Sequence, residues 1–134
     1  MAPSQLDRFC LRIRAFAAER MWERFHDPKN LVMALTGEVG ELNELFQWLT
    51  PAEGLSAMRD PQRAEAVRDE LADIFYYVLR LADVLDLDLL EAAEAKLAKN
   101  ERRYPVAKSR GNARKYTEFS PRPTRGPRLP RTRS

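Results

Sequence analysis

The residues with the clearest chemical potential are two pairs of acidic side chains, Glu38 with Glu41 and Glu70 with Asp73. The members of each pair are three positions apart, a spacing that places both carboxylates on one face if the segment is helical. If the two faces meet, four carboxylates converge on one point, and such oxygen ligands suit Mg²⁺. The alternative is that these residues belong to the solvated surface of two helices.

The position of Glu38 favours the metal-binding interpretation. It lies between Leu35 and Leu42 in an apolar stripe, where an unpaired carboxylate is costly to bury. Glu41 and Glu44 add negative charge nearby, and carboxylates about 6 Å apart repel by roughly 3 kcal/mol at an effective dielectric constant near 20. A divalent cation would remove this repulsion, whereas without one the pKa values of the cluster should rise.

Helical periodicity and helix-start signals divide the first part of the chain into four expected helices. Asp27-Pro28 and Asp60-Pro61 each combine a good N-cap with a proline suited to the first helical turn. Thr50-Pro51 ends the second helix and begins a loop with room for one helical turn. Neither a strand-like alternation nor a glycine-rich phosphate loop is present. The prediction is an all-α, four-helix, bundle-like fold with helices at 5–24, 28–49, 61–85 and 89–103.

The third expected helix has a regular apolar stripe that should face the core. Its members are Val67, Leu71, Ile74, Val78, Leu81 and Leu85. Glu70, Asp73 and Tyr77 form the adjacent stripe, so we expect them to border the core.

Composition limits the possible classes of protein. The 134 residues suit one domain, and the single cysteine, Cys10, permits no disulfide within the chain. The single histidine, His26, makes a histidine-based zinc site or a Ser-His-Asp triad improbable and suggests a surface or capping residue. No apolar run is long enough to span a membrane, and we expect a cytoplasmic protein.

The charge is distributed unevenly along the chain. Residues 1–105 carry 14 Lys and Arg against 19 Asp and Glu, whereas residues 106–134 carry nine against one. The high isoelectric point therefore belongs to the C-terminal region and gives little support for nucleic-acid binding by the domain. We predict an all-α domain over 1–119 and a disordered, basic, Pro/Arg-rich tail over 120–134.

The fourth expected helix has one face with cationic and hydrogen-bonding side chains. Lys96, Asn100, Arg103 and Tyr104 follow one another at helical spacing. Opposite a carboxylate-bound metal, Lys96 and Arg103 could hold phosphate oxygens. A solvated face is the alternative.

Several other residues have structural interpretations that compete with functional ones. Trp22, Trp48 and Tyr77 are of types found more often in cores than in base-stacking sites. Gly37 and Gly40 lie inside an expected helix, where glycine is destabilising, and close helix packing is favoured over close approach of a ligand.

Six segments, in order and at compatible spacings, together resemble the MazG-like all-α NTP pyrophosphatases, and most closely their dCTP pyrophosphatase branch. The similarity extends over about residues 8–119. The segments are Phe25-His26-Asp27-Pro28-Lys29-Asn30-Leu31, Gly37-Glu38-Val39-Gly40-Glu41-Leu42, Leu45-Phe46-Gln47-Trp48, Glu70-Leu71-Ala72-Asp73, Lys96…Asn100…Arg102-Arg103-Tyr104-Pro105 and Lys115-Tyr116-Thr117-Glu118.

This resemblance implies a Mg²⁺-dependent hydrolase that converts a nucleoside triphosphate, with dCTP or a modified dCTP as the expected substrate, to the monophosphate and pyrophosphate. It implies a homodimer or a homotetramer built as a dimer of dimers, in which a neighbouring chain completes the bundle. The implied metal ligands are Glu38, Glu41, Glu70 and Asp73, with Glu41 as the candidate to orient or deprotonate the attacking water. The implied nucleotide contacts are Trp22 and Trp48 around the base, with Tyr77, Lys96, Asn100, Arg103 and Tyr104.

One departure and two rival interpretations accompany the resemblance. The dCTP branch has a histidine in its first helix where this chain has Ile13, so the base preference stays open. A different class of function is a non-enzymatic helical module that senses nucleotides or acts as an adaptor, with a tail that binds nucleic acid. Within the enzyme class, the substrate could be another phosphorylated metabolite.

Overall fold

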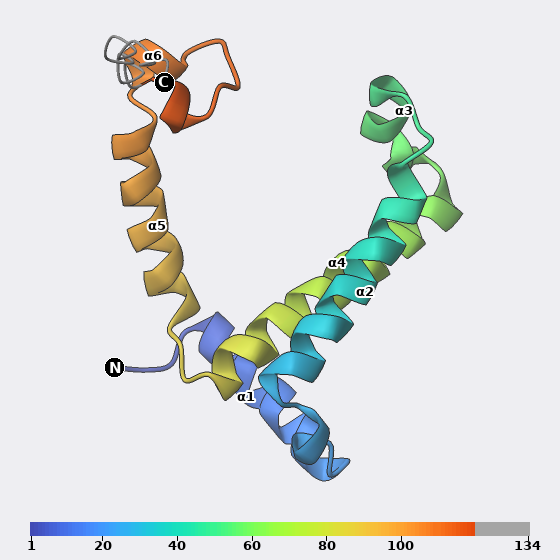
Figure 1. The fold of residues 1–134 in the computed structure, drawn as a ribbon. Coiled ribbons are helices and arrows are strands. Elements are labelled where there is room, and N and C mark those ends of the chain that lie inside the picture. Colours follow the sequence, from blue (N-terminus) through green and yellow to red (C-terminus); the bar gives the residue numbers. More distant parts are fainter. Residues whose placement is uncertain (120–134) are drawn as a thin grey trace, which may run out of the picture. The chain divides into compact units, whose positions relative to one another are not determined.

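The computed structural model describes residues 1–119, so the predicted disordered tail at 120–134 lies outside the described residues. The chain divides into two compact units, of which the first is Met1–Leu90 and the second begins at Glu91. All regular structure in the described part is helical, as predicted, and Figure 1 follows it along the chain.

The helical elements of the first unit are α1 (Gln5–Glu19), η1 (Glu23–Phe25), α2 (Pro28–Phe46), α3 (Pro51–Leu55), η2 (Ala57–Arg59) and α4 (Pro61–Val84). A side chain caps the start of each of these α-helices, but of neither 3₁₀ helix. The side chains of Asp27, Thr50 and Asp60 each accept a backbone hydrogen bond at a helix start, and each precedes a proline. The predicted starts of α2 and α4 are confirmed.

Helix α1 ends earlier than predicted. It stops at Glu19 rather than near Arg24, because Met21 adopts a left-handed conformation with φ of 55°. The amide of Trp22 then donates to the carbonyl of Ala17, and the turn leads into η1. The predicted single helix is therefore a helix, a tight turn and a short 3₁₀ helix.

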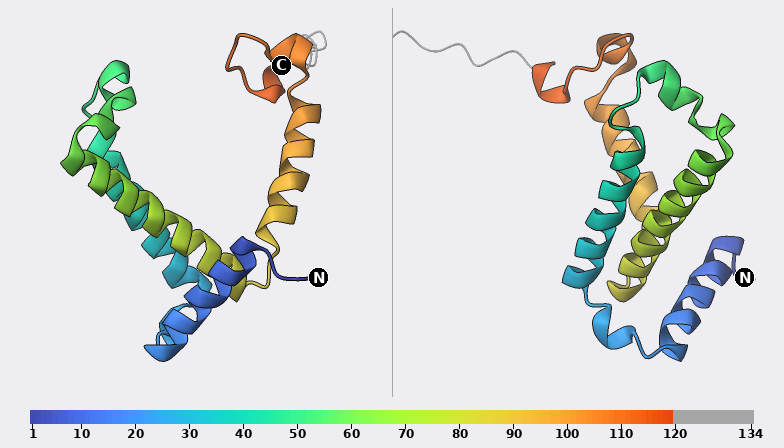
Figure 2. Two further views of the ribbon diagram at one scale, coloured as in Figure 1. Left: turned by 180° about the vertical axis from the view of Figure 1, so that it is seen from behind. Right: turned by 90° about the vertical axis from the view of Figure 1, so that its right-hand side faces the viewer.

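Helix α2 runs along α4, and α1 packs against α4 near its C-terminal end (Figure 2). Half of the buried apolar side chains are alanines, and among residues 1–119 only Leu31 is both large and fully buried. Leu71 and Leu85 are exposed, so the prediction that they face the core is wrong for the isolated chain. The buried apolar residues are Ile13, Ala17, Leu31, Ala57, Ala64, Val67, Leu79 and Ala82.

The second unit contains most of helix α5 (Leu89–Arg103), followed by α6 (Val106–Ser109) and η3 (Tyr116–Glu118). Aromatic contacts hold its end together, since the Tyr104 ring lies 5.9 Å from that of Tyr116 and 6.1 Å from that of Phe119, centroid to centroid. Across the described residues, none of the helices has the length and apolar character needed to cross a membrane.

Candidate metal and nucleotide site

Helices α2 and α4 bring together three of the four predicted metal ligands. Carboxylate oxygens of Glu38 and Glu41 on α2 and of Glu70 on α4 all lie within 4.8 Å of one another. Glu38 and Glu70 are half-buried, whereas Glu41 is exposed. The Oε2 atoms of Glu38 and Glu70 are buried and have no hydrogen-bond partner. A buried carboxylate oxygen without a hydrogen-bond partner is unfavourable unless it binds a proton or a cation.

The pKa shifts of this cluster reflect its crowded negative charge. Contact with the Glu70 carboxyl acts to lower the pKa of Glu38, but burial and the charges of Glu41 and Asp73 outweigh it and raise that pKa. The adjoining Glu38 carboxyl, together with burial and Glu41, raises the pKa of Glu70 to about 7. A divalent cation would favour the ionised forms of both groups.

Asp73 lies beside the three converging carboxylates rather than among them. It follows Glu70 by three residues on α4, and its charge is close enough to raise the pKa of Glu38. Burial, and then the charges of Glu38 and Asp73, raise the pKa of the Tyr77 phenol. Tyr77 therefore borders the acidic cluster, as its predicted position next to the core requires.

The donor set fits a hard divalent cation. Three carboxylates from two helices leave coordination positions for water and for phosphate oxygens, the arrangement in which Mg²⁺ is usually held in proteins. A Cβ added at Gly37 or Gly40 would meet nothing within 4 Å. The expectation that these glycines permit close helix packing is therefore wrong within this chain, and the space next to Glu38 and Glu41 is open.

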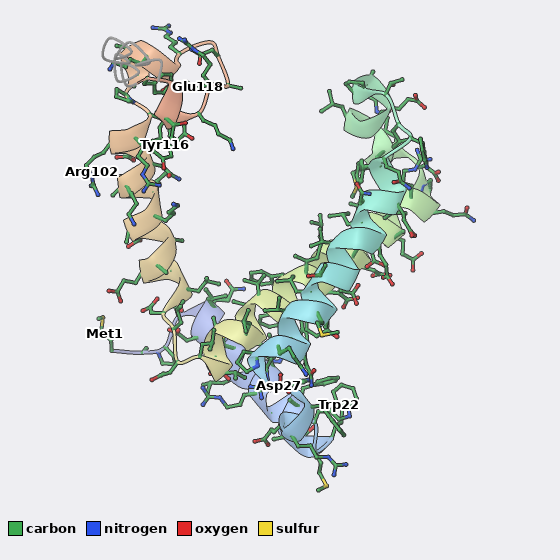
Figure 3. The ribbon with its side chains drawn as sticks, viewed as in Figure 1. Met1, Trp22, Asp27, Arg102, Tyr116 and Glu118 are labelled. Atoms are coloured by element: carbon green, nitrogen blue, oxygen red, sulfur yellow. The ribbon has the colours of Figure 1, made fainter. Side chains whose placement is uncertain are left out.

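The two tryptophans lie near opposite ends of α2. Trp22 precedes the helix, near Asp27 at its start (Figure 3), whereas Trp48 follows its last residue, Phe46. Trp22 is 42% exposed and Trp48 is 87% exposed. A helix of this length spans about 28 Å. One chain therefore does not bring the two indole rings together around a base.

A row of aromatic contacts connects Trp22 with the acidic cluster. The Trp22 and Phe16 ring centroids are 5.6 Å apart, Phe16 and Tyr76 are 6.4 Å apart, and Tyr76 and Tyr77 are 5.1 Å apart. The sequence interpretation missed Phe16 and Tyr76, although Phe16 is in the apolar stripe of α1 and Tyr76 adjoins Tyr77. This row makes Trp22, rather than Trp48, the tryptophan linked to the acidic cluster of its own chain.

The predicted phosphate-binding residues lie on α5, in the second unit. Lys96 is exposed, whereas Asn100 and Arg103 are half-buried. The Arg103 guanidinium lies 4.6 Å from the centroid of the Tyr116 ring, and Tyr104 packs edge-on against the same ring. The contacts of Lys96, Asn100, Arg103 and Tyr104 with a nucleotide stay predictions.

These features define a class of helical protein in which two helices bring together a cluster of carboxylates that could hold a metal ion. Comparison with known proteins gives the family: the sequence pattern described as MazG-like matches residues 34–119, and the chain belongs to the MazG-like family. The predicted resemblance is therefore confirmed.

Several characterised proteins are similar over most of the chain. The dCTP pyrophosphatase 1 of Rattus norvegicus is 50% identical over 104 residues, which cover 78% of this chain and 61% of that protein. The Homo sapiens protein of the same name is 48% identical over the same shares. A crystal structure of a pyrophosphatase from Archaeoglobus fulgidus DSM 4304 has a TM-score of 0.72 and 35% identity, and the similarity covers 78% of this chain and 96% of that one. The chain thus spans about 61% of the length of these curated relatives.

Proposed function

We propose that this protein is a Mg²⁺-dependent nucleoside triphosphate pyrophosphohydrolase that releases a nucleoside monophosphate and pyrophosphate. The observation that carries the proposal is the convergence of Glu38, Glu41 and Glu70, with buried oxygens that have no partner. The names of its relatives support the reaction, and those of the curated ones support dCTP or a modified dCTP as substrate.

The proposed mechanism assigns a role to each part of the acidic cluster. Bound Mg²⁺ would supply charge neutralisation and a water of lowered pKa at the phosphates. Glu38 and Glu70, which are half-buried, would hold the cation, and Asp73 would add negative charge or a ligand at its side. Glu41, the exposed member, would orient the attacking water and accept its proton.

The remaining nucleotide contacts are proposed from the family resemblance. Lys96 and Arg103 bind phosphate oxygens, and Asn100, Tyr77 and Tyr104 contact the nucleotide. Trp22 covers the base, and Trp48 of a second subunit could cover it from the other side.

We also propose that the protein is a homo-oligomer, either a dimer or a dimer of dimers, in the cytoplasm. Large apolar side chains are exposed on the two helices that form the acidic cluster, an unusual surface for a monomer. On α2 they include Val32, Met33 and Val39, and on α4 they include Leu71 and Phe75.

A panel of dNTPs and NTPs tests the proposal. Each is incubated with the protein and Mg²⁺, and the products are resolved as monophosphate with pyrophosphate or as diphosphate with phosphate. We expect monophosphate and pyrophosphate, loss of turnover in Glu38→Gln, and normal turnover in Glu65→Gln, which changes an exposed glutamate of α4 outside the acidic cluster. No turnover of any nucleotide would refute the enzyme and favour a nucleotide-sensing or adaptor module.

A further inference from the structure

Arg80 of α4 is the one charged side chain that is buried among the described residues, at 5% exposure. Its Nε donates to Nδ1 of His26 over 3.0 Å, and its Nη1 donates to Oδ2 of Asp83 over 2.9 Å. Burying a charge is unfavourable unless hydrogen bonds and an opposite charge compensate. Arg80 has both, and one of its two partners lies far away in the sequence.

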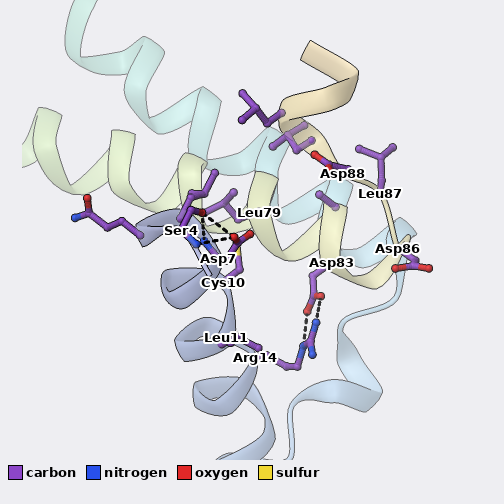
Figure 4. Close-up of a pocket in the computed structure, with 15 residues that line it drawn as sticks. Ser4, Asp7, Cys10, Leu11, Arg14, Leu79, Asp83, Asp86, Leu87 and Asp88 are labelled. Atoms are coloured by element: carbon purple, nitrogen blue, oxygen red, sulfur yellow. Dashed lines mark hydrogen bonds and ion pairs between the residues drawn. The ribbon is translucent and has the colours of Figure 1, made fainter. Parts of the chain in front are cut away.

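Asp83 is in turn fixed from α1. Nε of Arg14 donates to Oδ2 of Asp83 over 3.1 Å, and the second arm of the guanidinium binds the other carboxylate oxygen (Figure 4). The hydrogen bond with Arg14 is the main cause that keeps the pKa of Asp83 below its ordinary value. Arg80 is therefore held by an ionised partner that is itself held in a bidentate pair.

His26 connects this network to the segment between α1 and α2. Because Nδ1 accepts a hydrogen bond from Arg80, the ring is neutral and carries its proton on Nε2. The segment begins at Met21, whose left-handed backbone is unfavourable for a residue other than glycine and needs support from its surroundings. The bond from Arg80 to His26 ties the far end of that segment to α4.

The His26 ring also touches the indole of Trp22. Their centroids are 6.4 Å apart with the rings inclined by 61°, and Phe16 meets the same indole at 76°. Two rings thus fix the orientation of Trp22, and Arg80 holds one of them in place. A side chain that is oriented before binding loses less conformational freedom when a ligand arrives.

We propose that Arg80, acting through His26, is a positioning residue that holds Trp22 ready for the nucleotide base. This inference rests on the proposed function, because it takes Trp22 to contact the base. A purely structural network would instead only join α1 to α4, and its loss would lower stability without altering nucleotide affinity or the surroundings of Trp22.

Kinetic measurements separate positioning from catalysis. Arg80→Lys keeps a positive charge but lacks the planar guanidinium whose separate Nε and Nη1 atoms donate to His26 and Asp83. His26→Phe keeps the ring beside Trp22 and removes the acceptor. For both variants we expect KM to rise about tenfold while kcat changes less than about twofold, the signature of lost binding rather than lost chemistry. His26→Asn, whose Oδ1 can replace Nδ1 as acceptor, should recover part of the loss, and Arg68→Lys, on the exposed side of α4, should have no effect.

Fluorescence gives a second readout that does not depend on activity. In a Trp48→Phe background, Trp22 is the single tryptophan. We expect Arg80→Lys and His26→Phe to shift its emission to longer wavelength and to increase quenching by acrylamide. If either variant only lowers the melting temperature, with KM and Trp22 emission unchanged, the inference is wrong. If the unmodified protein hydrolyses no nucleotide, the proposed function fails, and Trp22 emission still decides whether Arg80 orients this side chain.

Discussion

Metal affinity should depend strongly on pH, because the proton on Glu70 competes with the cation. The cluster raises the pKa of Glu70 to about 7, and a carboxyl must be ionised to bind metal well. A group with this pKa is about one-tenth ionised at pH 6 and about nine-tenths ionised at pH 8. The apparent affinity for Mg²⁺ should therefore increase about tenfold between these values, and binding at pH 7 should release about half a proton per site.

Isothermal titration calorimetry at pH 6, 7 and 8 measures both quantities, provided that buffers of different ionisation enthalpy are compared. Glu70→Gln removes the titrating carboxyl, so it should weaken binding and flatten its pH dependence. Glu65→Gln, which replaces an exposed glutamate of the same helix, should retain the full dependence. The reasoning would be refuted if the unmodified protein bound Mg²⁺ equally well at pH 6 and pH 8. It would also be refuted if the Mg²⁺ affinity of Glu70→Gln changed with pH as much as that of the unmodified protein.

Three further predictions concern stability. Glu38→Gln should abolish pyrophosphate release yet leave the metal-free protein at least as stable, because it relieves repulsion; a large fall in melting temperature in EDTA would instead make Glu38 structural. Burial and the charge of Arg80 lower the pKa of His26 in the folded protein from its ordinary 6.5. The contribution of neutral His26 to the free energy of unfolding is therefore complete above pH 6.5 and is lost as the pH falls through the pKa of His26 in the folded protein. Denaturant titrations at several pH values should show this loss of stability in the unmodified protein and not in His26→Asn. Asp83, whose pKa lies below its ordinary 3.8, should affect stability only at lower pH. Leu31→Ala, at a side chain that is 1% exposed, should reduce the free energy of unfolding by about 2–5 kcal/mol, whereas Leu55→Ala, at 90% exposure, should change it little.

Local signals in the sequence were sufficient for most of the fold. Asp27-Pro28 and Asp60-Pro61 determine where α2 and α4 begin, because capping depends only on nearby residues. The early end of α1 was missed because Met21 occupies a left-handed position where glycine or asparagine would have given a signal. Arg80 was missed because its partner His26 lies 54 residues away, and only the packing of the segment against α4 brings them together.

The convergence of acidic side chains from α2 and α4 was predictable from the sequence, and its detailed geometry was less so. The spacing of Glu38 with Glu41 places both on one face of α2 whatever the tertiary structure. Whether Glu70 or Asp73 lies nearer to them depends on how α4 is rotated against α2, which no local pattern determines. The structure places Glu70 among the converging oxygens and Asp73 beside them.

The length of α2 has a consequence for the proposed nucleotide site. Trp22 and Trp48 flank a helix of about 28 Å, far longer than a nucleobase, so one chain cannot place both indole rings on the same base. If both enclose it, Trp48 must come from another subunit, and we expect that subunit to pack on the exposed apolar side chains of α2 and α4. The exposed apolar side chains of these helices, among them Val39 and Phe75, would be buried by such a contact. Substituting them with charged residues should therefore separate the subunits and weaken nucleotide binding together, whereas a tryptophan pair that acted within one chain would leave binding intact in the monomer.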